Sequence, residues 1–115
     1  FLLNKYSIKY RKTLIVGAIS KFDGHIFTFD FKNKKNPCLR CFYQSEPSDE
    51  ILNCEAEGII GPVAGIIGNI QANEILKKIL KIGKDLNKHI LIINLLTLNF
   101  RKVFFSKKKN CICKN

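Results

Sequence analysis

Four of the five cysteines in this chain form two closely spaced pairs. Cys38 and Cys41 are separated by two residues, and Cys111 and Cys113 by one. A gap of two residues lets two thiolates reach the same tetrahedral ion, and thiolates are common ligands of structural zinc. We therefore predict that the two pairs share one structural zinc ion, whose binding would stabilise the fold. The alternative is that the cysteines are unrelated small apolar residues.

The fifth cysteine, Cys54, has no partner at such a spacing. It precedes Gly61-Pro62, where a helix is expected to begin, and a helix N-terminus lowers the pKa of a nearby thiol. Glu55 and Glu57 oppose that effect. Cys54 is thus a candidate catalytic nucleophile, with an ordinary loop cysteine as the alternative. An odd cysteine count without a secretory signal favours a reducing compartment, so we expect a cytoplasmic protein.

The chain is strongly basic, with 20 lysines and arginines against 9 acidic residues and a net charge of +11 over 115 residues. Such a charge is typical of proteins with polyanionic partners. However, lysine, isoleucine and asparagine, which all have AT-rich codons, are abundant, so the charge is better attributed to drift of the amino-acid composition than to selection for such a partner. Arginine, the side chain best suited to bidentate phosphate contacts, is also rare. A zinc-stapled basic module that binds nucleic acid is therefore the second hypothesis rather than the first.

The hydrophobic pattern predicts an α/β protein. An amphipathic helix ends within residues 1–12, and a polar loop at 32–36 leads into the first cysteine pair. Four strands are expected, over Thr13–Gly17 (buried), Gly24–Asp30, His89–Leu95 and Leu98–Phe105. The longest apolar stretches are shorter than the roughly 18–20 residues that cross a bilayer, so we expect no membrane association. His25 and His89 lie in these strands and are interpreted as ordinary polar positions.

One long helix is predicted between Pro62, which suits its first turn, and Gly83, which suits the position after its end. Gly61, Gly65 and Gly68 recur at helical spacing and form a strip without side chains. We expect another backbone to approach this strip closely. A phosphate-binding loop is the rival interpretation, but the spacing is not GxGxxG and no strand directly precedes it.

The cysteines and this helix together resemble the C-terminal half of the ThiF/MoeB/HesA family, relatives of the ubiquitin-activating enzymes. The similar segments are PCLRCFYQSEP, NCEAEG and GPVAGIIGNIQANEILK, with LIVGAISKFDGHIFTF upstream. The matching positions are Pro37, Cys38, Arg40, Cys41, Cys54, Gly58, Gly61, Pro62, Gly65, Gly68, Gln71, Ala72 and Glu74. The sequence departs from the family pattern in two ways. The terminal pair is one residue shorter than the family's CxxC, and Glu55 and Glu57 lie on either side of the position where many members carry glutamate.

The resemblance implies a Rossmann-like fold, of which residues 1–115 would form the C-terminal part of a single ThiF-type domain. A mixed sheet, one long glycine-striped helix and a zinc-stapled tail are the expected parts. The resemblance also implies that the intact protein uses ATP and magnesium to adenylate the C-terminal glycine of a ubiquitin-like sulfur carrier, for molybdopterin or thiamine biosynthesis. Cys54 matches the loop cysteine that links covalently to the carrier in some branches, and homodimers are usual.

The nucleotide site of that family lies in the half that would precede Phe1. The chain has no methionine, and we expect that a segment is missing upstream and that these residues alone do not adenylate a carrier. A decayed gene remnant that folds poorly without the missing half is the third hypothesis.

Overall fold

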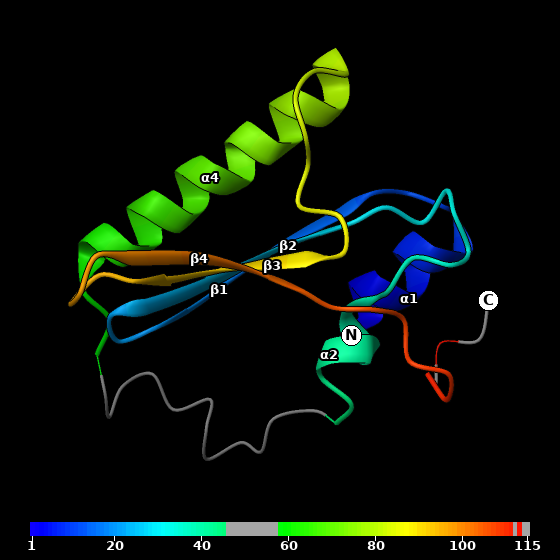
Figure 1. Cartoon of the computed structure of the whole chain (residues 1–115), viewed down its shortest axis with the longest axis horizontal. Coiled ribbons are helices and arrows are strands. Elements are labelled where there is room, and N and C mark those ends of the chain that lie inside the picture. The colour runs from blue at the N-terminus through cyan, green and yellow to red at the C-terminus, as the bar shows by residue number, and fades with distance from the viewer. Residues whose placement is uncertain (46–57, 112, 114–115) are drawn as a thin grey trace.

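The computed structural model describes residues 1–45, 58–111 and 113 of the chain (Figure 1). Among them, the helices are α1 (Leu2–Lys9), α2 (Leu39–Phe42) and α4 (Gly61–Leu80). The strands are β1 (Leu14–Ser20), β2 (Asp23–Phe29), β3 (His89–Asn94) and β4 (Asn99–Phe104). The expected first helix and all four expected strands are therefore present, with ends shifted by a few residues. None of the described helices has the length and apolar character needed to cross a membrane.

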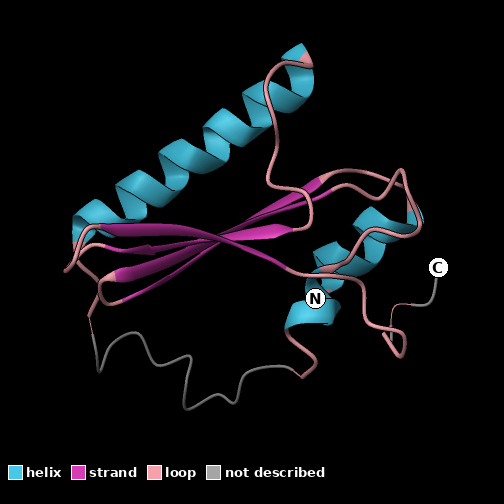
Figure 2. Cartoon of the chain, viewed as in Figure 1, coloured by secondary structure: helices cyan, strands magenta, loops and turns pink. Residues whose placement is uncertain are grey.

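The strands form one sheet (Figure 2), and their order in it is β1-β2-β3-β4. Every pairing between these strands is antiparallel. Short turns join β1 to β2 and β3 to β4, as is usual for antiparallel neighbours, whereas the segment that contains α4 joins β2 to β3. The mixed sheet expected from the sequence is thus not seen in the described residues, where parallel contacts occur only as two isolated bridges. β1 is only half-buried, because it lies at an edge of this sheet.

The side chains of β2 alternate between two cores on opposite faces of the sheet. Phe27 and Phe29 pack with the cysteines on one face, whereas Ile26 packs against α4 on the other. This alternation follows from the two-residue period of a strand, and it is the pattern that the sequence predicted for residues 24–30. The cysteine cluster and the long helix therefore lie on opposite sides of one strand.

The long helix α4 begins at Gly61, with Pro62 in its first turn as expected. It ends at Leu80, because Lys81 adopts the left-handed conformation that terminates a helix, with φ of 54°. The sequence predicted this role for Gly83, which also has a positive φ but lies two residues further on. In Figure 1 the N-terminal end of α4 lies close to the sheet, and its C-terminal end rises away from it.

The prediction that another backbone closely approaches the glycine strip of α4 is wrong for the described residues. A Cβ atom added at Gly61, Gly65 or Gly68 would meet nothing within 4 Å. The helix approaches the sheet through its opposite side, and the close contact occurs at two strand glycines instead. A Cβ at Gly24 would lie 2.2 Å from Ile67 Cδ1. The helix therefore sits close to the sheet because β1 and β2 carry glycines, not because α4 does.

These two kinds of glycine give opposite predictions for stability. Gly24→Ala should lower the free energy of unfolding by about 1–3 kcal/mol, because its methyl group overpacks the core beside buried Ile67. Gly65→Ala should raise it by about 0.5–1 kcal/mol, because alanine favours the helix and has open space. Urea denaturation of both variants measures the difference. A destabilised Gly65→Ala chain would instead indicate a packed neighbour on the glycine strip.

Candidate metal centre

The first cysteine pair is shaped by a tight turn at the start of α2. Cys38 is the extended residue before the helix, and Cys41 lies in its first turn. The backbone N–H of Cys41 donates to the carbonyl of Cys38 at 2.9 Å, and the N–H of Cys38 donates to Cys41 Sγ at 3.5 Å. These bonds direct both thiols to the same side. The two-residue spacing therefore brings the sulfurs together, as the sequence predicted.

The third cysteine comes from the tail that follows β4. Phe105 packs its ring against Phe27 and Phe29, which turns the tail toward the cysteine face of the sheet. Lys107 Nζ then donates to the carbonyl of Lys34 at 2.7 Å, joining the tail to the loop before the cysteine pair. Cys111 follows, buried at the end of this path.

Cys38, Cys41 and Cys111 form one buried group, with their sulfur atoms all within 4.8 Å of one another. The Sγ of Cys38 lies 3.9 Å from that of Cys41 and 3.5 Å from that of Cys111. Tetrahedral zinc with bonds of about 2.3 Å separates its sulfur ligands by roughly 3.8 Å. The three thiols thus already have the spacing of ligands on one zinc ion, although they come from segments 73 residues apart.

Cys113 lies beside this group but outside it. Its side chain packs against the same core cluster, and its Sγ accepts a hydrogen bond from Asn4 Nδ2 at 3.4 Å. Three of the four predicted ligands are therefore brought together. The fourth is adjacent, and its role as a ligand stays a prediction. Cys54, the predicted nucleophile, lies outside the described residues.

The thiols are in an environment that suits a bound cation. Burial raises the pKa of Cys38, and it raises that of Cys111 to about 11. Burial also acts to raise the pKa of Cys41, but hydrogen bonds from the backbone N–H groups of Cys38 and Lys108 outweigh it and lower that pKa. The protein itself thus makes the thiol of Cys41 easier to ionise than those of Cys38 and Cys111. A divalent metal ion would supply the positive charge that lets the other thiols ionise.

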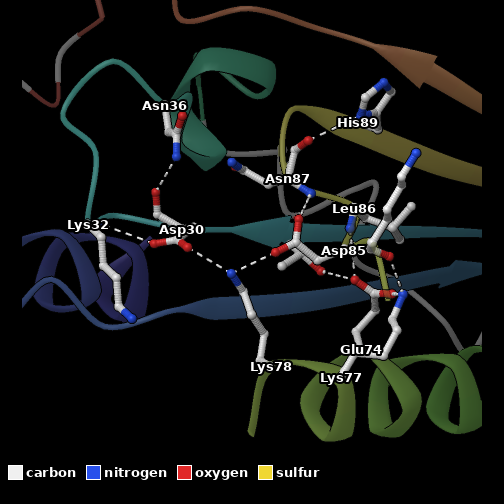
Figure 3. A network of polar contacts seen from close by, with 12 residues as sticks. Asp30, Lys32, Asn36, Glu74, Lys77, Lys78, Asp85, Leu86, Asn87 and His89 are labelled. Atoms are coloured by element: carbon white, nitrogen blue, oxygen red, sulfur yellow. Dashed lines mark hydrogen bonds and ion pairs between the residues drawn. The ribbon is translucent and has the colours of Figure 1, made fainter. Parts of the chain in front are cut away.

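The loop that carries the cysteine pair is anchored by an ion-pair network (Figure 3). Lys78 of α4 reaches Asp30 at 2.7 Å and Asp85 at 2.6 Å. Asp30 in turn accepts the backbone N–H of Lys32 at 3.0 Å, and its carbonyl accepts the side-chain amide of Asn36 at 2.8 Å. The network therefore fixes the start of the loop to the long helix on the opposite face of the sheet.

A second polar contact joins α4 to the sheet. Glu74 is 2% exposed, and its Oε2 accepts hydrogen bonds at 2.9 Å from Thr28 Oγ1 and from the backbone N–H of Leu86. Lys77 forms an ion pair with its other oxygen. These bonds satisfy a buried carboxylate, so Glu74 acts as a structural tether in the described part of the chain.

The histidines contribute no ligand to the three-cysteine group. His25 Nδ1 lies 3.5 Å from the hydroxyl of Tyr43, and burial lowers the pKa of its ring. His89 Nδ1 lies 3.1 Å from the carbonyl of Asn87. Sequence reasoning missed Asn4 and the network around Lys78, because their partners lie between 7 and 109 residues away in the chain.

The cysteine geometry predicts one zinc ion per chain after purification with a thiol protectant. Cys38→Ser should reduce zinc binding to near zero, because Cys38 lies within 4 Å of both other sulfurs. Cys54→Ser is the matched control, since it removes the one cysteine outside the predicted ligand set. Metal analysis and competition with a chromophoric chelator measure both. Zinc-free wild-type protein that cannot be reconstituted would contradict the site.

The ion-pair network predicts an acid-sensitive stability. Burial alone would raise the pKa values of Asp30 and Asp85, but hydrogen bonds from Lys78 outweigh it and hold both below 3.8. The stabilisation is therefore complete above about pH 4 and is lost as the pH falls through these lowered values. Lys78→Met should be destabilised by about 1 kcal/mol at pH 7, with the difference from wild type shrinking toward pH 3.

Urea midpoints of wild type and Lys78→Met at the two pH values measure this effect. Lys102→Met, on the exposed strand β4, is the control for the loss of one positive charge. An equal destabilisation of Lys78→Met at pH 7 and pH 3 would show that the network does not contribute through its charges.

Comparisons with known proteins agree with this geometry. The ThiF family profile matches residues 1–115. The chain is 31% identical over 115 residues to a sulfur carrier protein adenylyltransferase from Thermus thermophilus, covering 96% of this chain and 42% of that protein. It is 36% identical over 114 residues to the adenylyltransferase and sulfurtransferase MOCS3 of Drosophila willistoni, covering 96% of this chain and 25% of the relative.

A solved structure shows the same fold. The crystal structure of Escherichia coli MccB with ATP superposes with a TM-score of 0.73 at 16% identity, covering 96% of this chain and 33% of MccB. The chain therefore spans between a quarter and less than half of the proteins that it matches here. The similarity of sequence over the whole chain and the shared fold lead to one conclusion: this chain belongs to the ThiF family.

Proposed function

We propose that residues 1–115 are the C-terminal part of a single ThiF-type domain that adenylates a ubiquitin-like sulfur carrier. In this reaction the C-terminal carboxylate of the carrier attacks the α-phosphorus of ATP, an acyl adenylate forms and pyrophosphate leaves. The observation that carries the proposal is the match of the family to residues 1–115, together with relatives named as sulfur carrier adenylyltransferases. The product would serve sulfur transfer in molybdopterin or thiamine biosynthesis.

The free edge of the sheet supports the proposal that further polypeptide completes the domain. β1 has the sequence LIVGAIS, which is apolar on both faces and carries no charge. Such strands are typical of the interior of sheets that are covered on both sides. β4, at the other edge, carries Arg101 and Lys102, as protected edges commonly do. β1 thus has the composition of an interior strand, although in the described sheet it lies at an edge.

An apolar groove next to β1 supports the same proposal. It has a volume of about 390 Å³ and is lined by Thr13, Ile15, Ile75, Lys78 and Ile79. Ile75 and Ile79 on α4 remain exposed beside it, Ile79 by 68%. A strand that added to β1 would fill this groove and cover the exposed part of α4. In this proposal, the added polypeptide holds ATP and magnesium.

In the proposed domain, the cysteine centre is structural. Its ligands would be Cys38, Cys41, Cys111 and Cys113, and the bound zinc would supply a cross-link between the tail and the loop after β2. Closed four-thiolate sites leave no open coordination position for a substrate. We assign the chemistry of carrier activation to the rest of the protein, and we retain Cys54 as the candidate for a covalent link to the carrier. We propose a homodimer for the intact protein.

A chimera tests the proposed function. The part of the Thermus adenylyltransferase that precedes the aligned segment would be joined to this chain. The chimera should catalyse exchange between pyrophosphate and ATP that rises at least about tenfold when the Thermus sulfur carrier is added, whereas this chain alone should show none. The measurement is the incorporation of labelled pyrophosphate into ATP.

Two controls make the result interpretable. Cys54→Ser in the chimera should keep the exchange, because adenylation requires no thiol, while a covalent adduct with the carrier should disappear. Size-exclusion chromatography establishes that the chimera is folded and soluble. A folded chimera without carrier-dependent exchange would contradict the proposal, and exchange by this chain alone would contradict the location of the nucleotide site.

A further inference from the structure

A buried asparagine joins three segments of the chain next to the cysteine centre. Asn4 lies in α1 and is 1% exposed. Its Oδ1 accepts the backbone N–H of Leu39 at 3.1 Å, inside the turn between the first two cysteines. Its Nδ2 lies 3.4 Å from Cys113 Sγ in the tail. The side-chain amide of Asn4 therefore connects α1, to which it belongs, with the Cys38–Cys41 turn and the C-terminal tail.

The orientation of this amide is fixed by its partners. A backbone N–H is only a donor, so the group that faces Leu39 must be the carbonyl oxygen of Asn4. The NH₂ group then necessarily faces Cys113. The side chain of Asn4 is thus arranged so that its amide N–H donates to Cys113 Sγ.

The two cysteine pairs differ in the hydrogen-bond donor that orients the second thiol of the pair. In the first pair, the N–H of Cys38 donates to Cys41 Sγ, so the turn itself orients the second thiol. The second pair has only one intervening residue, and Cys113 Sγ lies outside the group of three sulfurs that are already within 4.8 Å of one another. The donor that reaches Cys113 Sγ comes instead from Asn4, 109 residues away.

We propose that Asn4 is the positioning residue that holds Cys113 as the fourth ligand of the cysteine centre. The inference rests on the metal site proposed above and assigns a role to a residue outside the cysteines. Groups that hydrogen-bond to metal ligands orient them, and their loss typically lowers metal affinity by about 10–100-fold. The contact also gives a partner to the N–H group of Asn4, the one residue of α1 that is buried.

The test is a double-mutant cycle on metal affinity. Asn4→Asp keeps an oxygen acceptor for Leu39 but replaces the donor with a carboxylate that repels a thiolate. Zinc affinity, measured by competition with a chromophoric chelator, should fall by about 10–100-fold in Asn4→Asp. The same substitution should have little effect when Cys113→Ser is already present, because the two residues act through one contact. In the cobalt-substituted chain, sulfur-to-metal charge-transfer absorbance should drop in both single variants.

Several results would overturn the inference. One is Asn4→Asp protein that binds zinc as wild type does, and another is an equal loss of affinity with and without Cys113. A third is Cys113→Ser protein with the affinity and cobalt spectrum of wild type, which would leave a three-cysteine site without this ligand. Failure of wild-type protein to bind zinc or cobalt at all would instead defeat the metal site itself, so the two failures are distinguishable.

If the variants do not fold, the same contact can be tested by a measurement on the wild-type chain. The wild-type chain would be loaded with the spin-active cadmium isotope. The side-chain amide protons of Asn4 should then show scalar coupling to the metal through the N–H···S hydrogen bond to Cys113. Coupling from the backbone N–H of Cys38 through Cys41 serves as the internal positive control. Coupling at Cys38 without coupling at Asn4 would overturn the proposal.

Discussion

The alternation of side chains along β2 is the constraint on which the rest of the structure depends. Phe27 and Phe29 point to one face of the sheet, and Ile26 points to the other. Each face needs a cover, because apolar side chains on an open sheet face remain in contact with water. The long helix α4 covers one face. The other is covered by aromatic rings and the cysteine group.

The cysteine centre closes a long loop in the chain. Cys38 and Cys111 are 73 residues apart, and bringing them together costs conformational entropy. The proposed metal ion would offset that cost and tie the tail to the sheet face. Packing of Phe105 on Phe27 and Phe29 directs the tail there, and the bond between Lys107 and the carbonyl of Lys34 holds it.

The two faces are also connected to each other through polar contacts at the end of β2. Lys78 extends from α4 to Asp30, the residue from which the loop to the cysteines departs. Glu74 binds Thr28 on the same strand. The position of the helix and the position of the loop that carries Cys38 and Cys41 are therefore coupled through β2. The uncharged edge of β1 and the exposed side of α4 are among the parts of the fold that this arrangement leaves uncovered, and they are where the proposed remainder of the domain would pack.

Sequence by itself determined most of the elements of this protein, although not the short helix α2, and the approach of the first two cysteines. The two-residue period of β2, Pro62 at the start of α4 and the spacing of Cys38 and Cys41 are local features, and local geometry follows from them directly. Only the tertiary structure decided which surfaces meet. The glycines that matter for helix packing lie on the strands, because the side chain of Ile67 on α4 needs space on the sheet, and the sequence pattern of α4 does not show which surface the helix packs against. The contact between the amide of Asn4 and Cys113 was likewise decided by the tertiary structure. The two residues are 109 positions apart in the chain, and local sequence patterns do not show which distant residues meet.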